Sequence, residues 1–172
     1  MSWNTHNLTD ESDVLLFEAF VDRILKDPIT GNVHERLECC TPEVEVRVDF
    51  DKLSLYRGLA EPGDSRVTIY AKNITNEHEA LGVFIHEATH MRDALVAGRI
   101  PRVNGRYVNT FRAEYRARRN ELAFILNRVP TLRERQVIIT EMRREGYTVE
   151  TGIRIAGNTI REGSDAGNPD PA

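Results

Sequence analysis

The segment from Asn76 to Val96 constrains the fold of this chain more than any other part of its sequence. Its apolar residues recur at helical spacing and, at 100° per residue, fall within one arc of roughly 100°; they are Leu81, Phe84, Ile85, Ala88 and Leu95. His86 and His90 fall on nearly the opposite side of the same helix, about 40° apart. We therefore expect a helix that ends at Gly98, packs its apolar stripe on the core and points both histidines outward together.

The two histidines belong to the run His86-Glu87-Ala88-Thr89-His90, which is an H-E-x-x-H pattern. Two imidazoles on one helical face can supply two nitrogen ligands to a zinc ion at about 2.0–2.1 Å. The alternative is a pair of surface histidines on a solvated helix face. A di-iron site is excluded, because it needs a second E-x-x-H run and this chain has none.

On this motif the chain resembles the zincin metallopeptidases, over roughly residues 66–127. The resemblance implies that His86 and His90 bind one Zn²⁺ per chain. It also implies that Glu87 is the general base for a Zn-activated water that hydrolyses a peptide bond.

A third protein ligand is expected, because catalytic zinc ions usually have three. The metzincin extension is absent, and the gluzincin pattern places a glutamate on a later helix. Glu114 lies 24 residues after His90 and shares a helix face with apolar residues, where an unpaired carboxylate would be costly. Its alternative role is an ion pair with Arg118, and Glu121 is the substitute ligand. If Glu114 is the ligand, Glu121 or Arg118 would support the site. Arg118 stands where the best-known gluzincins have an aspartate.

Three further side chains are candidates near the metal. Asp93, three residues after His90, either holds a ligand imidazole by its second nitrogen or is a surface acid that pairs with Arg92 or Arg99. Tyr107 and Tyr115 are the candidates for stabilising the oxyanion, and ordinary packing is the alternative for both. The remaining histidines have no partner at ligand spacing, so we expect them on the surface: His6, His34 and His78.

The fold that these patterns predict is α+β and zincin-like. A small twisted sheet packs on the helix that carries the H-E-x-x-H motif, a mainly helical C-terminal portion follows, and the zinc cleft lies between them. The expected helices are 8–26, 76–96, 110–127 and 130–145, the expected strands are 43–50 and 66–71, and the segment 27–42 is expected to be mostly loop. The resemblance implies that strand 66–71 is an edge strand that aligns an extended peptide. We expect one domain over 1–162, with a hairpin in 147–163, and a disordered tail over 163–172.

Composition and charge limit the classes of protein. The 172 residues are 40% hydrophobic and 29% charged, as in a folded domain. Acids in the first thirty residues and the absence of a long apolar run argue against Sec export and a membrane span. Adjacent Cys39 and Cys40 argue against a disulfide framework. These features favour a cytoplasmic protein, or one delivered into a target cell by a dedicated non-Sec system.

The charge is unevenly distributed along the chain. Residues 1–91 hold 8 Lys/Arg and 17 Asp/Glu, whereas residues 92–161 hold 15 Arg and 7 acids. The simpler interpretation is that the two halves pack together and partly neutralise each other. The other is that the basic half binds an anionic partner such as nucleic acid.

The predicted function is that of a zinc-dependent endopeptidase, with a protein or peptide substrate bound in extended form. The small size and the lack of other domains resemble bacterial effector or toxin proteases, for which an immunity or inhibitor protein would be a partner. The alternatives are a zincin that acts on nucleic acid through its Arg-rich half, which is less favoured, and a non-catalytic interaction module.

Overall fold

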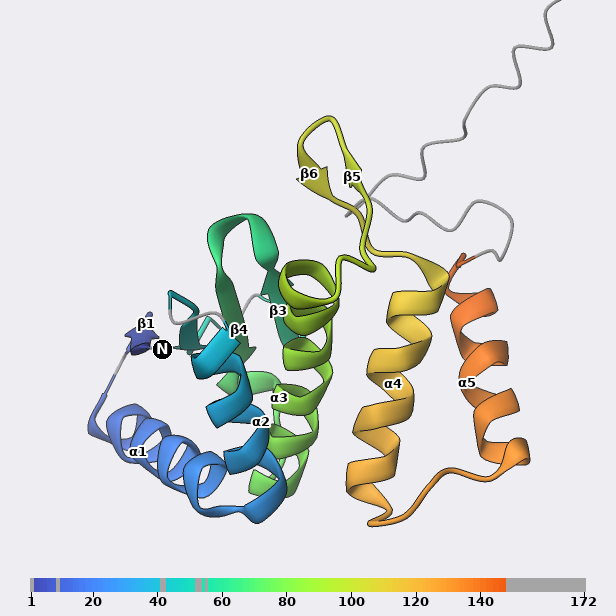
Figure 1. Cartoon of the computed structure of the whole chain (residues 1–172). Coiled ribbons are helices and arrows are strands. Elements are labelled where there is room, and N and C mark those ends of the chain that lie inside the picture. The colour runs from blue at the N-terminus through green and yellow to red at the C-terminus, as the bar shows by residue number, and fades with distance from the viewer. Residues whose placement is uncertain (1, 9, 41–42, 52–53, 55, 148–172) are drawn as a thin grey trace, which may run out of the picture.

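Five helices and a small open sheet make up the chain in the computed structural model, which describes residues 2–8, 10–40, 43–51, 54 and 56–147 (Figure 1). The predicted α+β class is therefore confirmed. The elements in chain order are β1 Ser2–His6, α1 Glu11–Lys26, α2 Pro28–Cys40, β2 Glu45–Asp49, β3 Gly58–Glu61, β4 Arg66–Tyr70, α3 Glu77–Met91, β5 Arg102–Val103, β6 Arg106–Tyr107, α4 Phe111–Ile125 and α5 Leu132–Arg144. Short 3₁₀ turns span Pro62–Asp64 and Ala71–Asn73, and one π-helical turn, Arg92–Val96, continues α3.

The main sheet has the strand order β1-β2-β4-β3. β1, β2 and β4 run parallel, and β3 pairs with β4 in the antiparallel direction. The alternation predicted for residues 43–50 is confirmed, since Val44, Val46, Val48 and Phe50 are buried while Glu45 and Arg47 are partly exposed. On the outer face, Arg66 donates from Nε to Oε2 of Glu45 at 3.1 Å.

The prediction of an edge strand at 66–71 is wrong, because β4 lies between β2 and β3. The edge strand on that side of the sheet is β3, which is absent from the strands that the sequence predicted. β3 has only four residues, Gly58-Leu59-Ala60-Glu61, and all of them are partly buried. So short a segment shows no clear alternation, and periodicity along one strand carries no information about its neighbours.

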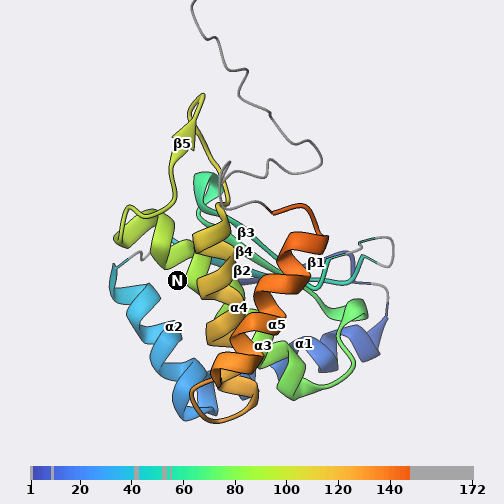
Figure 2. The same cartoon turned by 90° about the vertical axis from the view of Figure 1, so that its right-hand side faces the viewer.

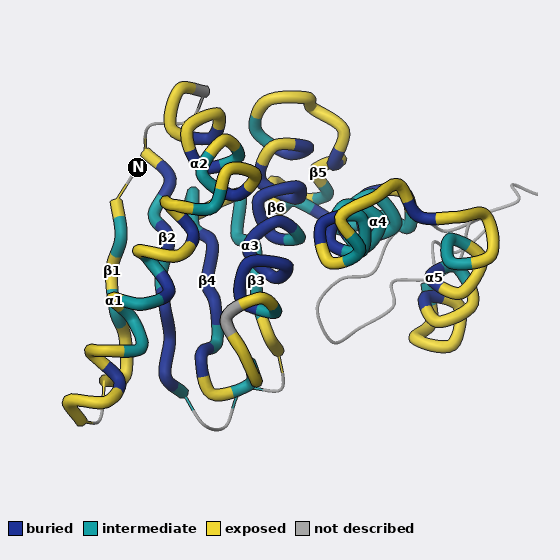
Figure 3. The backbone as a smooth tube through the Cα atoms, turned by 90° about the horizontal axis from the view of Figure 1, so that it is seen from below, coloured by how far each residue is buried: buried dark blue, intermediate teal, exposed yellow. Residues whose placement is uncertain are grey.

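One face of the sheet is covered by α1, α2 and α3. Their apolar side chains form a continuous core with the inner face of β2 and β4: Ile24, Leu37, Val44, Val46, Val67, Ile69, Leu81, Phe84 and Met91. In Figure 3 β2, β4 and α3 are largely dark blue, whereas α5, on the far side of α4, is largely yellow. Apolar burial on one side of the sheet therefore fixes the position of α3.

The prediction of a loop at 27–42 is also wrong, because α2 fills most of that segment. Pro28 is the first residue of the helix, where its missing N–H costs nothing. The side chain of Asp27 accepts from the backbone N–H groups of Ile29 and Thr30, so it caps the start. Pro28 and Gly31 are residue types that often interrupt a helix, yet both occupy helical positions here.

The second helical layer consists of α4 and α5, with α4 packed on α3 and α5 packed on α4 (Figure 2). The predicted starts at Asn76 and Thr110 are confirmed, since both side chains accept from the N–H group three residues on. A capping box of Thr131 and Glu134 begins α5, and Gly146, with φ +90°, follows its end.

Because α4 covers the side of α3 opposite the sheet, α3 is buried nearly all round. The histidines therefore point outward from the core but meet α4 and not solvent. His90 is 7% exposed and Glu87 is also 7% exposed.

The two halves of the chain pack together through α3 and α4, and Arg57 of the first half pairs with Glu121 of the second. Arg116, Arg118 and Arg128 pair with acids of their own half, which are Asp93, Glu114 and Glu134. None of the described helices combines the length and the apolar character that a membrane span requires. The thiol of Cys39 is free and exposed. The hairpin predicted in 147–163 and the tail fall almost entirely outside the described residues.

Candidate metal centre

His86, His90 and Glu114 converge at the contact between α3 and α4. The Nε2 atoms of the two histidines are 3.2 Å apart, and Oε2 of Glu114 is 3.4 Å from Nε2 of His90. Oε1 of Glu114 is 3.8 Å from Nε2 of His86. One ligand atom from each of the three lies within 4.8 Å of the others. The structure thus brings together the three residues that the sequence indicated.

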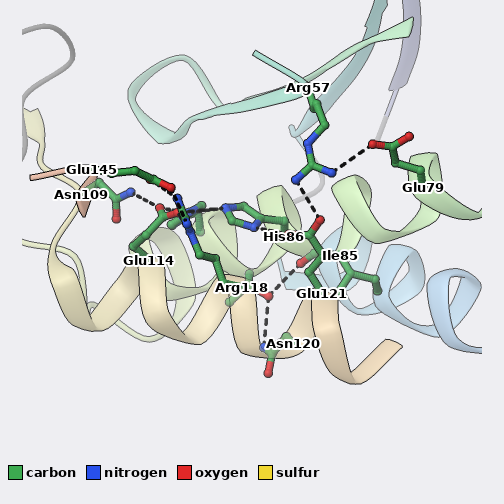
Figure 4. Close-up of polar contacts among 12 residues, drawn as sticks. Arg57, Glu79, Ile85, His86, Asn109, Glu114, Arg118, Asn120, Glu121 and Glu145 are labelled. Atoms are coloured by element: carbon green, nitrogen blue, oxygen red, sulfur yellow. Dashed lines mark hydrogen bonds and ion pairs between the residues drawn. The ribbon is translucent and has the colours of Figure 1, made fainter. Parts of the chain in front are cut away.

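The ring of His86 is oriented by Glu121, seven residues after Glu114 on α4. Oε2 of Glu121 is 2.8 Å from Nδ1 of His86. Since a carboxylate can only accept, Nδ1 carries the proton and the lone pair of neutral His86 is on Nε2, toward His90 and Glu114. Glu121 is held in turn by Arg57, whose guanidinium also reaches Glu79 (Figure 4). Glu121 therefore contacts His86 at Nδ1, and the group that could hold a metal consists of His86, His90 and Glu114.

The carboxylate of Glu114 is held by two donors. Asn109 donates from Nδ2 to Oε2 at 2.8 Å, and Arg118 donates from Nε to Oε1 at 2.6 Å. Arg118 also pairs with Glu145 of the α5 end. The ion pair weighed as an alternative for Glu114 therefore exists alongside the grouping with the histidines. Arg118 and His86 both approach Oε1, and Asn109 and His90 both approach Oε2.

The charges of this group shift several pKa values in the metal-free protein. Burial disfavours charge on His86, but the hydrogen bond to Glu121 and the nearby carboxylates outweigh it and raise the pKa of His86 to about 9. Burial also acts against ionised Glu114, yet the two histidines and Arg118 hold the pKa of this carboxyl well below its usual range. Glu114 is therefore ionised and ready to act as a ligand at neutral pH.

Glu87 differs from the other carboxylates of the site. Within the described chain, its carboxylate has no hydrogen-bond or ion-pair partner. Burial raises the pKa of Glu87, and the charges of the two histidines only partly oppose that shift. Its side chain lies against Gly58 at the start of β3, where a Cβ atom would stand 2.8 Å from Oε1. A buried carboxylate with a raised pKa and no fixed partner is suited to accept a proton as a general base.

Asp93 does not lie among the histidines. It is fully buried and accepts from Nε of Arg116 at 2.6 Å, with Nη1 of Arg99 at 3.4 Å. Arg92 is 3.9 Å away. The expectation of a surface acid is wrong, although the pairing with Arg92 and Arg99 is present. Among the residues that the structure describes, no imidazole contacts Asp93.

The two tyrosines are also placed away from the ligand atoms. Tyr107 packs in a small cluster around Ala113, and the guanidinium of Arg102 lies 4.3 Å from its ring centroid. Tyr115 is half-buried on α4, about 100° around the helix from Glu114. Neither makes a contact in the described residues that joins it to His86, His90 or Glu114.

His34, expected on the surface, is buried and accepts a hydrogen bond from Nε1 of Trp3 at 3.2 Å. The expectation failed because it assumed a loop at 27–42. Sequence reasoning also missed Asn109, Arg57 and Glu145 as supports of the site. Asn109 stands just before the helix cap Thr110, close enough in sequence to have been considered. Arg57 and Glu145 reach the site only through the tertiary fold.

A cavity of about 600 Å³ lies beside His86, between α4 and α5. Arg57, Glu121 and Arg118 line it close to the histidine, and apolar side chains of α4 and α5 line the rest. His86 is the candidate ligand that lines this cavity, and α5 forms one of its walls.

Comparisons with known proteins add no relative to this geometry. The chain matches no protein-family model, and searches of curated proteins and of solved structures found no significant match.

Proposed function

We propose that this chain is a zinc-dependent endopeptidase with the zincin arrangement of its site. The observation that carries the proposal is the convergence of His86, His90 and Glu114 beside a buried, unpartnered Glu87. A general base, two imidazoles and one carboxylate on two packed helices are the groups that metal-assisted hydrolysis of a peptide bond requires.

The donor set and its spacing fit zinc. Four ligands arranged tetrahedrally at 2.0–2.1 Å lie about 3.3 Å from one another. The distances of 3.2 Å between the imidazole nitrogens and 3.4 Å from His90 to Oε2 of Glu114 are close to that value, and the 3.8 Å from His86 to Oε1 of Glu114 is longer. Calcium and magnesium prefer sites made only of oxygen, so two nitrogen donors favour zinc over them. Three protein donors leave one tetrahedral position for water or substrate.

A bound zinc ion would polarise the substrate carbonyl and lower the pKa of water at the open position. Glu87 would take a proton from the attacking water at its carboxylate and pass it to the leaving amine nitrogen. The raised pKa of Glu87 suits both steps. Glu121 keeps Nε2 of His86 directed at the site, and Asn109 and Arg118 fix the carboxylate of Glu114.

The alignment of an extended peptide is assigned in this proposal to β3. β3 pairs with β4 on one side and, among the described residues, with no strand on the other. Its first residue, Gly58, lies against Glu87. A peptide added as a further strand would therefore pass close to the general base. The effector or toxin role, the inhibitor partner, the non-Sec route and the nucleic-acid alternative stay predictions.

The test is zinc content by elemental analysis after incubation with zinc and removal of excess metal. We expect about one zinc per chain in the wild type and in Glu18→Ala, a distant surface control, and far less in Glu114→Ala. Glu121→Ala should still bind zinc, but with lower affinity. No zinc in the wild type, or full zinc in Glu114→Ala, would overturn the assigned ligands.

Catalysis is tested on the zinc-loaded protein with unfolded casein and a mixed peptide library, read by mass spectrometry. Glu87→Gln should keep its zinc and lose cleavage by a factor of at least about 100. A zinc-loaded wild type that cleaves nothing, or a Glu87→Gln variant as active as the wild type, would contradict the peptidase proposal and favour the non-catalytic module.

A further inference from the structure

The cavity beside His86 has an apolar slot between α4 and α5. Leu122 and Ile125 line it from α4, and Val137 and Ile138 line it from α5. Ile125 is 41% exposed and Val137 is 50% exposed, so both carry apolar surface that water now covers. A hydrocarbon chain inserted here would remove that surface from water on both sides.

The charged groups around the slot are unequal in number. Four glutamates and two arginines line the cavity. Both arginines and three of the glutamates already have ion-pair partners: Arg57 with Glu79 and Glu121, Arg118 with Glu114 and Glu145, and Glu134 with Arg128. The lining therefore has an excess of negative charge and no cation left over for an acidic ligand.

The remaining carboxylate belongs to Glu141. It is exposed, and none of the described residues pairs with it. Glu141 lies one helical turn after Val137 and three residues after Ile138, so it shares their face of α5. The slot thus has apolar walls and an unpaired negative charge at the same face.

We propose that this pocket binds a lysine or arginine side chain of the peptide substrate. The methylene stem would lie between Ile125 and Val137, and the cationic head would pair with Glu141. An acidic side chain would meet the excess negative charge, and an aliphatic one would leave Glu141 unpaired. His86 borders the same cavity, so the recognised residue would lie beside one of the candidate metal ligands. This inference rests on the proposed peptidase function and adds its specificity.

Binding is measured apart from cleavage, on zinc-loaded Glu87→Gln protein. The probes are dye-labelled pentapeptides, Gly-Ala-Xaa-Ala-Gly, in which the central residue is Lys, Arg, Leu or Glu. Fluorescence anisotropy should show the Lys and Arg peptides binding about tenfold more tightly than the Glu peptide. Adding Glu141→Lys should remove or reverse that order. Glu18→Lys, the same charge change on the exposed face of α1, should leave it unchanged.

A second pair of variants tests the apolar slot. Val137→Trp fills it from an exposed position and should weaken binding of the Lys peptide, whereas Val129→Trp, in the loop before α5, should not. Equal affinity for all four peptides overturns the inference. So does a preference that survives Glu141→Lys, or no binding of the Lys and Arg peptides up to about 1 mM.

Cleavage of the same peptides by the zinc-loaded parent protein separates the two proposals. Cleavage without a preference for Lys or Arg overturns the pocket and leaves the peptidase. A preference in binding that depends on Glu141, together with no cleavage of these peptides, casein or the library, overturns the peptidase and leaves the pocket.

Discussion

Gly58 and Glu87 are in contact across the gap between β3 and α3. A Cβ atom on Gly58 would stand 2.8 Å from both Cγ and Oε1 of Glu87, and 2.6 Å from Cγ1 of Val83. Any residue with a side chain would therefore push the edge strand away from α3 or turn the Glu87 carboxylate out of its place. Glycine is required here by the closeness of the approach.

Gly58→Ala should lower peptidase activity without removing the metal. The added methyl group displaces the Glu87 carboxylate, while the ligands on α3 and α4 are untouched. We expect kcat/KM to fall by a factor of about 100, since small misplacements of a catalytic group have effects of that size. Gly63→Ala is the matched control, because nothing lies within 4 Å of its Cβ position. Wild-type kcat/KM in Gly58→Ala would contradict the placement of Glu87.

Glu121→Gln should weaken zinc binding without abolishing it. The substitution replaces the carboxylate that accepts from Nδ1 of His86 and removes a partner of Arg57. Loss of such a support typically costs 10–100-fold in metal affinity, and we expect a change of about that size. Competition with a chromophoric chelator measures it, with Glu141→Gln as a control on the neighbouring helix. Equal zinc affinities in Glu121→Gln and the wild type would mean that His86 is oriented by other groups.

Zinc affinity should rise with pH up to about pH 9. The pKa of His86 is raised to about 9, so zinc displaces a proton from this histidine at neutral pH. One displaced proton weakens binding about tenfold for each pH unit below that value. Titrations at several pH values against a chelator of known pH dependence would show this slope, and a flat profile would contradict the assignment.

His86 also makes the stability of the metal-free protein depend on pH. Because the folded pKa of His86 lies above the ordinary histidine value of 6.5, its contribution to the free energy of unfolding is fully present below about pH 6.5. It is lost as the pH rises through about 9. Thermal unfolding of chelator-treated protein across this range should show the loss, and His86→Gln should show less of it.

Asp93→Asn should destabilise the fold and leave the metal site intact. Asp93 is a fully buried carboxylate that is paired with Arg116 and Arg99. Removing one partner of a buried ion pair typically costs about 3 kcal/mol. Urea unfolding should report that loss in the free energy of unfolding, while zinc affinity stays within a factor of about two. If Asp93→Asn greatly lowered zinc affinity and left stability unchanged, the result would support the alternative that Asp93 holds a ligand histidine.

The sequence was most informative where a helical pattern and a chemical motif coincide. The spacing of His86 and His90, and a carboxylate on the apolar face at Glu114, were enough to indicate the three residues that converge. Local periodicity could not reveal β3, which is short, or α2, where Pro28 and Gly31 resemble breaks. Nor could it show that α4 would cover the histidines, because the partner of a helix face is decided by the tertiary fold.

Glu114, Arg118 and Glu121 occupy successive turns of a single helix, α4. One helix thus carries the candidate ligand Glu114, the cation of Arg118 that pairs with it, and the carboxylate of Glu121 that orients His86 on α3. A slide of α4 by one turn, about 5.4 Å, would withdraw all three together. The three contacts of α4 with the candidate metal centre would therefore be lost together. A molecule that shifted α4 would disrupt the centre without contacting a histidine.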